Sequence, residues 1–352
     1  LFVTESKFLN NYAQNGAGIY FNGTSGTVDG SEFSGNRASY GGAIYVNKGD
    51  FNISNSQFNQ NKSTAGGGAL YVTSDASVVL DNTSFEENTV TVGSSGGAIF
   101  NNGNLTIKNG TYFANNEVAL GSGGAISNRG TLNIDSARFE NNFSKQDGGA
   151  IADTGSTVVK NSEFINNSSV EYIGGAIAST KDIEIENCLF DKNSAYSFGG
   201  AVAVMQGKAS ISGSKFTENV SKGSFGGGAL INYLSTVDLT GDNLFQNNSS
   251  AANGGAISAT INSVTNISGG AKFIGNKADG LGGGIFSQGV ININANDAEN
   301  EILFSGNSDR NGSNAVHLDI YNNTPVGIGE MNINVSNGAK VVFEDNISGV
   351  EN

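Results

Sequence analysis

The sequence predicts an all-β fold, a right-handed parallel β-helix with about three strands per turn and roughly 12–13 turns. Three observations support this prediction. The motif Phe-x-x-Asn recurs along the chain, with successive Phe residues 25 to 31 positions apart until a last interval of 39. A second motif, Gly-Gly-Ala followed by an aliphatic residue, alternates with the first. The remaining residues are mostly Asn, Gly, Ser and β-branched residues, which favour short strands and turns over helices.

The thirteen Phe-x-x-Asn copies begin at Phe8, Phe33, Phe58, Phe85, Phe113, Phe139, Phe164, Phe190, Phe216, Phe245, Phe273, Phe304 and Phe343. A repeat of this length cannot bury a core alone, because its apolar face needs a neighbouring turn. We therefore expect residues 1–352 to form a single β-helical domain.

Three columns of side chains are expected to point into the stack. An aliphatic residue usually stands five positions before each Phe, and a small residue stands two positions before it. Stacked turns place like on like at the strand spacing, so the Phe rings should form a column of their own. The small column is formed by Ser6, Ser31, Ser56, Thr83, Thr111, Ala137, Ser162, Cys188, Ser214 and Ala271.

The Asn of each Phe-x-x-Asn motif is expected to set the bend that follows the Phe strand. Asn tolerates left-handed backbone, and stacked amides can form ladders of hydrogen bonds between turns. In the second motif, Gly-Gly permits positive φ and a close approach of the backbone to the core. We assume that the following aliphatic residue faces inward, although so short a strand does not decide between Ala43 and Ile44.

If the aliphatic residue faces inward, the next residue faces outward. In four consecutive repeats this residue is aromatic, namely Tyr20, Tyr45, Tyr71 and Phe100. A ladder of rings on one face is a candidate partner site or sugar platform. Simple cross-strand stacking that protects the sheet explains the same pattern.

The spacing between the two motifs varies, which predicts where the coil carries insertions. We expect inserted loops at residues 89–95 and 220–225. Residues 317–342, which include Pro325, are expected to form a decorated C-terminal excursion or the approach to a different module.

Composition excludes several classes of function. The chain has 18 Lys and Arg against 32 Asp and Glu, a formal net charge of -14. With no basic cluster, we expect no nucleic-acid partner. No apolar run is long enough to span a bilayer, so we expect no membrane insertion by this segment. A single Cys and a single His exclude a disulfide framework and any multi-histidine metal centre, and we expect no cofactor.

No residue is predicted to be catalytic. Cys188 falls in the small inward column, which indicates a buried packing residue rather than a nucleophile. His317 follows Val316 as Tyr20 follows Ile19, which predicts an outward, surface-filling side chain.

Acidic residues are scattered rather than clustered. The weak metal candidate is a calcium ion held by Asp297, Glu299 and Glu301, in a stretch without a recognised calcium-loop spacing. An enzyme acting on polysaccharide would need three or more acidic groups and a cation converging in one groove. The sequence by itself identifies no such set.

The repeats resemble those of a known family. The tetrapeptides FLNN, FSGN, FENN and FINN, together with GGAIY, GGALY, GGAIF and GGAVAV, are similar to the passenger repeats of chlamydial polymorphic membrane proteins. The resemblance covers essentially the whole chain. It implies a surface-exposed β-helical passenger of an autotransporter, a class used for adhesion and antigenic display and normally followed by an outer-membrane β-barrel.

This resemblance implies an extracellular location at the bacterial cell surface. The pattern is already under way at Leu1, so we expect a segment of a longer protein, anchored by a region absent from this chain. We expect an adhesin without catalysis, whose partner is a receptor or glycan on a host or neighbouring cell. The alternatives are a polysaccharide-active enzyme and a structural stalk or filament subunit that self-associates along its stack.

Overall fold

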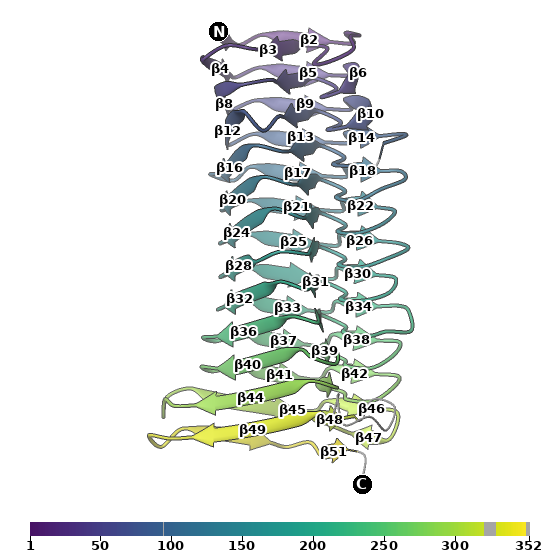
Figure 1. The fold of residues 1–352 in the computed structure, drawn as a ribbon, viewed down its shortest axis with the longest axis vertical. Coiled ribbons are helices and arrows are strands. Elements are labelled where there is room, and N and C mark those ends of the chain that lie inside the picture. Colours follow the sequence, from purple (N-terminus) through teal and green to yellow (C-terminus); the bar gives the residue numbers. More distant parts are fainter. Residues whose placement is uncertain (94, 320–328, 350–352) are drawn as a thin grey trace. The chain divides into compact units, whose positions relative to one another are not determined.

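The computed structural model describes residues 1–93, 95–319 and 329–349. Within them every regular element is a β-strand (Figure 1). The chain divides into two compact units, Leu1–Val170 and Glu171–Asn352, called unit 1 and unit 2 below. In each unit, successive turns pair in parallel, which confirms the predicted β-helical stack.

A full turn contains four strands, each in a different sheet. We name the sheets in chain order. The aliphatic sheet precedes the Phe-x-x-Asn motif, and the Phe sheet contains its Phe. The short sheet follows its Asn, and the Gly-Gly sheet begins at the aliphatic residue of Gly-Gly-Ala-aliphatic. The turn therefore has four strands rather than the predicted three, because the bend at each Asn leads into a short strand that hydrophobic periodicity does not detect.

In unit 1 the aliphatic sheet contains β1 (Phe2–Thr4), β4 (Ser25–Asp29), β8 (Gly49–Ser54), β12 (Ala76–Asp81), β16 (Asn104–Lys108), β20 (Thr131–Asp135) and β24 (Ser156–Lys160). The Phe sheet contains β2 (Lys7–Leu9), β5 (Glu32–Ser34), β9 (Gln57–Asn59), β13 (Ser84–Glu86), β17 (Tyr112–Ala114), β21 (Arg138–Glu140) and β25 (Glu163–Ile165). The short sheet contains β6 (Arg37–Tyr40), β10 (Lys62–Gly66), β14 (Thr89–Val90), β18 (Glu117–Val118), β22 (Phe143–Ser144) and β26 (Ser168–Ser169). The Gly-Gly sheet contains β3 (Ile19–Phe21), β7 (Ile44–Val46), β11 (Leu70–Val72), β15 (Ile99–Asn101), β19 (Ile126–Asn128) and β23 (Ile151–Asp153).

In unit 2 the aliphatic sheet contains β28 (Ile183–Glu186), β32 (Lys208–Ser212), β36 (Thr236–Thr240), β40 (Val264–Ser268), β44 (Val290–Ala295) and β49 (Glu330–Val335). The Phe sheet contains β29 (Leu189–Asp191), β33 (Lys215–Thr217), β37 (Leu244–Gln246), β41 (Lys272–Ile274), β45 (Glu301–Ser305) and β50 (Lys340–Phe343). The short sheet contains β30 (Ser194–Ala195), β34 (Val220–Ser221), β38 (Ser249–Ser250), β42 (Lys277–Ala278), β46 (Ser308–Asp309) and the antiparallel β47 (Gly312–Ser313). The Gly-Gly sheet contains β27 (Ile177–Ser179), β31 (Val202–Met205), β35 (Leu230–Tyr233), β39 (Ile257–Ala259), β43 (Ile285–Ser287), β48 (Val316–Leu318) and β51 (Ile347–Gly349).

The predicted inward columns are confirmed in both units. Phe rings of neighbouring turns lie nearly parallel, as for Phe33 and Phe58, whose centroids are 4.7 Å apart at an interplanar angle of 2°. In unit 2, Phe216 and Phe245 repeat this geometry at 4.7 Å and 3°. The small column is buried behind the rings, and its hydroxyls accept backbone N–H groups from the preceding turn, as Ser56 does from Ser31.

The motif Asn residues form the predicted amide ladder, which we call the Asn ladder. Asn88 donates from its backbone N–H and its side-chain amide to Asn116 Oδ1, both at 3.0 Å, and its amide also donates to the carbonyl of Phe58. These Asn residues keep ordinary negative φ. The left-handed residue is the one before each Asn, for example Glu87 at φ 54° and Asn115 at φ 54°, which corrects the expected role of the Asn at the bend.

The first Gly of each Gly-Gly pair adopts positive φ, as Gly123 does at 75°. A Cβ on the second, such as Gly124, would overlap the carbonyl oxygen of Gly149 in the next turn. The close approach predicted for Gly-Gly is therefore confirmed. Ala43 and Ile44 are both fully buried, so neither residue is excluded from the core.

The last copy of Phe-x-x-Asn departs from the others. Asp345, not Asn346, continues the Asn ladder, and its Oδ2 accepts both the backbone N–H and the amide of Asn307 at 2.9 and 2.8 Å. Its other oxygen accepts the hydroxyl of Ser313 at 3.0 Å. The reason is that β50 leads directly to β51 without a short strand between them. A carboxylate fits here because its neighbours, the N–H groups of Asn307 and the hydroxyl of Ser313, all donate, and a carboxylate is purely an acceptor.

The two predicted insertions are shorter than expected. Residues 89–95 begin with β14, and residues 220–225 begin with β34, so each range contains a strand of the short sheet. Within residues 317–342, β49 and most of β50 continue the aliphatic and Phe sheets, paired with β44 and β45. Pro325 lies in residues 320–328, outside the described residues. The single-domain organisation stays a prediction.

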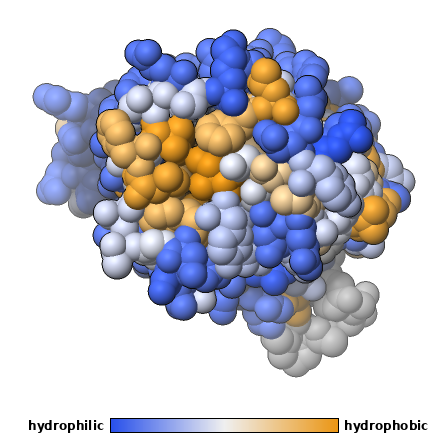
Figure 2. Space-filling model, turned by 90° about the horizontal axis from the view of Figure 1, so that it is seen from above, coloured by the Kyte–Doolittle hydropathy of each residue, from blue (hydrophilic) through white to orange (hydrophobic). Residues whose placement is uncertain are grey.

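The first turn of unit 1 has a neighbour on one side only. Figure 2 views this end and shows apolar side chains gathered within a polar rim. Leu1, Phe2 and Leu9 are exposed there, and Val3 and Phe8 are half-buried. Any outermost turn of a solenoid leaves its core side chains partly uncovered in this way.

Candidate binding surfaces

Tyr20, Tyr45, Tyr71 and Phe100 form the stack predicted from the sequence, here called the Tyr ladder. The strand register of β3, β7, β11 and β15 aligns these four residues. Their ring centroids are 5.4, 4.9 and 4.8 Å apart in order, at interplanar angles of 18° or less. Tyr40, in the strand before β7, packs its ring edge-on against Tyr71 at 5.3 Å.

Exposure falls along the Tyr ladder. Tyr20 is 52% exposed, Tyr45 and Tyr71 are half-buried, and Phe100 is only 6% exposed. The guanidinium carbon of Arg129 lies 5.1 Å from the Phe100 ring centroid, a cation–π contact. Phe100 therefore belongs to the stack but is buried, which corrects the expectation of an outward, accessible ring.

The stacking determines which atoms of the Tyr ladder a binding partner could contact. Neighbouring rings cover each other's faces, so Tyr45 presents its edge and hydroxyl outward. Burial raises the pKa of Tyr45, and the adjacent Tyr71 and Tyr20 raise it further. Burial and Tyr40 likewise raise the pKa of Tyr71, against an opposing effect of Arg129. The phenols of Tyr45 and Tyr71 thus stay neutral and able both to donate and to accept hydrogen bonds.

Unit 2 carries a second set of exposed rings that the sequence-based prediction missed. It consists of Tyr172, Ile173, Tyr196, Phe198, Phe225 and Tyr233, called the aromatic cluster below. Ile173 and Phe198 pack against Ala178, Ala203 and Ile231, which occupy the outward column of the Gly-Gly sheet yet are buried. Tyr172, Tyr196 and Phe225 are half or more exposed above them.

The two surfaces result from one geometric rule. In unit 1 the outward column supplies large rings, and the residue before Gly-Gly is often small, as at Gly66 and Ser95. In unit 2 the outward column is small at Ala178 and Ala203, and the residue before Gly-Gly is large. The sequence signal was therefore present as Ile173 and Phe198, each directly before its Gly-Gly pair, and as Phe225, which stands one residue earlier in its own turn, before Gly226.

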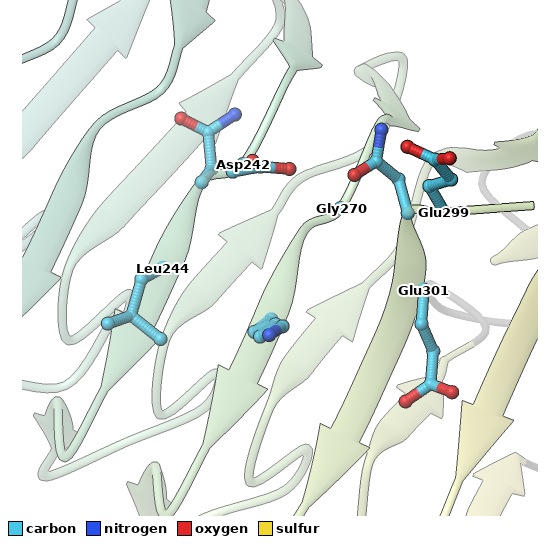
Figure 3. A pocket seen from close by; sticks show the side chains of 8 residues that line it. Asp242, Leu244, Gly270, Glu299 and Glu301 are labelled. Carbon is cyan, nitrogen blue, oxygen red and sulfur yellow. The ribbon is translucent and has the colours of Figure 1, made fainter. Parts of the chain in front are cut away.

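A groove of about 320 Å³ lies on the Phe sheet of unit 2 (Figure 3). Its lining residues are Asp242, Asn243, Leu244, Gly270, Lys272, Glu299, Asn300 and Glu301. At Gly270 a Cβ would overlap Asp242 Oδ1, so the Asp242 carboxylate lies directly against the backbone of the groove wall. Three carboxylates and a lysine line this one concavity.

The candidate calcium ligands are not gathered around one point. Asp297 folds back on its own loop, accepting from Glu299 N at 3.0 Å and from the Asn300 amide at 2.7 Å. Figure 3 shows the Glu299 and Glu301 side chains extending in opposite directions. Among the described residues no group of three or more His, Cys, Asp or Glu side chains is placed to hold a metal ion.

Cys188 is buried in the small column, as predicted. Its Sγ lies 3.2 Å from the carbonyl oxygen of Glu186, and its backbone N–H donates to Ser214 Oγ at 3.1 Å. These are the contacts that serine makes elsewhere in the column. The position therefore suits a small side chain that can hydrogen-bond to the backbone.

His317 is buried, with 6% exposure, so the prediction of an outward surface side chain is wrong. Its Nδ1 lies 2.7 Å from Ser348 Oγ, and its ring stacks on Phe286 at 5.9 Å. The final Gly-Gly strand, β51, supplies Ser348 and so covers the column at this point. Burial lowers the pKa of His317, opposed by the nearby carboxylates of Asp319 and Asp309 and reinforced by Arg310.

A pH-dependent loss of stability follows from this burial. Because the pKa of His317 in the folded state lies below the ordinary histidine value of 6.5, folding favours the neutral imidazole. The stabilisation is complete above pH 6.5 and is lost as pH falls through the folded-state pKa. We expect urea unfolding to show a lower free energy at pH 5 than at pH 7.5. In His317→Phe, which keeps the ring contact with Phe286, this difference should shrink; an equal difference in both proteins would contradict the assignment.

Two family models match the chain. The right handed beta helix region matches residues 1–161, and the Chlamydia polymorphic membrane protein repeat matches residues 244–260. The second match contains Phe245, Asn248 and the Gly-Gly-Ala-Ile ending at Ile257, one copy of each motif. No match is found to a curated protein or to a solved structure. In the described part of the chain, no helix has the length and apolar character to cross a membrane. The chain is thus a β-helix of the right-handed type whose repeats are similar to those of chlamydial polymorphic membrane proteins, as in an autotransporter passenger.

Proposed function

We propose that this chain is a surface-displayed adhesin segment that binds a receptor or glycan on a host or neighbouring cell and performs no catalysis. The observation that carries this proposal is the Tyr ladder, a row of aligned and partly exposed phenols on a passenger-like β-helix. Tyrosine is enriched at protein interfaces because its ring is apolar and its hydroxyl remains hydrated.

The mechanism is geometric. Backbone pairing fixes β3, β7 and β11, so the Tyr20, Tyr45 and Tyr71 rings are already held in their bound arrangement before a partner arrives. Little side-chain entropy is then lost on binding. Because the ring faces are occupied, the ladder would recognise a partner through ring edges and a row of hydroxyls, one from each turn.

Binding to whole cells tests this proposal. We expect Tyr45→Ala combined with Tyr71→Ala to weaken binding on the order of tenfold or more, as for the loss of interface tyrosines. Tyr45→Phe combined with Tyr71→Phe keeps the stack and separates the contribution of the hydroxyls from that of the rings. Tyr12→Ala is the matched control, since Tyr12 is 87% exposed on unit 1 but makes no contact in the ladder. Circular dichroism verifies that the double alanine variant is folded like the unaltered chain. Unchanged cell binding by a folded double alanine variant would refute a role for the Tyr ladder.

A second candidate function, action on a polysaccharide, is favoured by the groove that contains Asp242, Glu299, Glu301 and Lys272. Carboxylates beside a lysine are the groups that glycan-cleaving sites need. The test is release of reducing ends or unsaturated products from neutral and acidic polysaccharides. Turnover that is lost in Lys272→Ala and Glu301→Gln would replace the adhesin proposal with an enzymatic one.

A further inference from the structure

The aromatic cluster of unit 2 gathers rings from three consecutive turns outside the Tyr ladder. Tyr172, Tyr196 and Phe225 are 50%, 55% and 58% exposed, and Phe198 lies among them. We propose that this cluster binds a neutral pyranose sugar of a cell-surface glycan. This inference rests on the proposed binding function and names its ligand class and a second site.

Ring orientation distinguishes this cluster from the Tyr ladder. Phe198 stacks on Phe225 with centroids 4.5 Å apart at an interplanar angle of 27°, but it meets Tyr233 edge-on at 6.3 Å and 61°, so the rings do not form one parallel stack as they do in the Tyr ladder. The turn after Phe225 offers only the small side chains of residues 251–253 at this loop. Phe225 therefore keeps a ring face open beyond its contact with Phe198. An open aromatic face is the surface on which the C–H face of a pyranose stacks.

The polar groups of the cluster suit the other part of a sugar. Tyr233 packs against the buried base of the cluster, and the exposed Tyr172 and Tyr196 lie within two residues of Ile173 and Phe198 along the chain, so the cluster includes three phenols that can donate and accept hydrogen bonds. A pyranose presents hydroxyls at its rim and C–H groups on its face. The mixture of ring faces and hydroxyls matches this pattern better than it matches a purely apolar peptide.

Charge selects a neutral sugar over an anionic one. The chain carries a formal net charge of -14, which repels uronates, sialosides and sulfated glycans. Lys222, three residues before Phe225 in the sequence, has its Nζ 3.2 Å from Ser194 Oγ. One exposed lysine is not the basic patch that polyanion recognition requires.

The cluster is held in place by backbone pairing between its loops. Ile173 bridges to Phe198, and Phe198 bridges to Gly226, in parallel. Ser197 N donates to the carbonyl of Tyr172 at 2.8 Å, and Gly174 N donates to that of Phe198 at 3.0 Å. The buried Ala178, Ala203 and Ile231 support the loops from below. The surface is therefore preorganised, which lowers the entropic cost of binding.

Binding of the full chain to neutral oligosaccharides tests this inference. The probes are hexasaccharides of β-linked N-acetylglucosamine, galactose and mannose, with a sulfated uronate hexasaccharide and an apolar peptide as comparison ligands. We expect saturable binding to at least one neutral probe, weakened on the order of tenfold by Phe225→Ser and by Tyr196→Ser. Phe225→Trp should retain binding, and Tyr12→Ser, at an exposed tyrosine of unit 1 outside the Tyr ladder, should leave the affinity for the sugar unchanged.

Three results would overturn the inference: no binding to any neutral probe, equal affinity of Phe225→Ser and the unaltered chain, or binding confined to the sulfated hexasaccharide or the peptide. Phe225 is exposed, so its substitution is not expected to unfold the unit, and circular dichroism verifies this. Cell binding that survives Phe225→Ser without any sugar affinity would remove this inference while leaving the adhesin proposal intact. Sugar affinity without cell binding would support this inference and refute the adhesin proposal.

Discussion

Gly124→Ala is expected to destabilise the protein by more than about 4 kcal/mol, enough to unfold much of unit 1. The added Cβ would overlap the carbonyl oxygen of Gly149, and it would also press on the backbone of Phe143 at 2.7 Å. All of these are backbone atoms, and hydrogen bonds between turns hold this backbone in place, so no side-chain rotation can relieve the overlap. Separating the turns locally would break the parallel pairing of β19 with β23.

The measurement is urea unfolding of the full chain followed by far-ultraviolet circular dichroism. Gly110→Ala is the matched control, because Gly110 has a positive φ of 77° but no atom within 4 Å of its added Cβ. It should cost only about 1–2 kcal/mol, from backbone strain. Similar losses in the two variants would contradict this account, because Gly124 has no positive φ and its expected loss comes from contact between turns alone.

Asn116→Ala is expected to cost about 3–5 kcal/mol, because it leaves buried hydrogen-bonding groups without partners. Asn116 Oδ1 accepts from the backbone N–H and the amide of Asn88, and its own amide donates to the carbonyl of Phe85 and to Asn142 Oδ1. All four contacts are buried and lie between 2.9 and 3.0 Å. Alanine removes them and leaves a gap in the Asn ladder between Asn88 and Asn142.

Asn116→Asp should be comparably damaging at neutral pH, since it keeps the acceptor but sets a carboxylate against two oxygen acceptors. Asp345→Asn is the informative comparison, because Asp345 ends the Asn ladder and only accepts. Its free energy of unfolding should change by less than about 1 kcal/mol, since the amide oxygen can accept the same two bonds. Asn104→Ala, at an exposed position, should be nearly neutral. A small effect at Asn116 would mean that the Asn ladder contributes little to stability.

The repeated parts of this fold could be predicted from the sequence because each column is set by the same contact made many times. Phe stacks on Phe, Ser bonds to the backbone beside Ser, and Asn bonds to Asn, each one turn away. A side chain that is favourable in one turn is favourable in the next, so the repeated residue types in the sequence indicate which side chain each column requires. For the same reason Cys188 could be placed correctly in the core from its register alone.

The sequence did not determine the fourth strand, the left-handed residue at each bend, or which outward side chains are covered. Short strands such as β18 have too few residues for a pattern of alternating apolar and polar side chains to be seen. Each bend needs one residue with left-handed backbone, and many residue types occupy that position, including Glu87 and Lys192. Coverage is decided by contacts between different columns. Arg129 covers Phe100, Ser348 covers His317, and the loops before Gly-Gly cover Ala178 and Ala203. These contacts occur once each, between residues that repetition does not link, so only the tertiary structure could decide them.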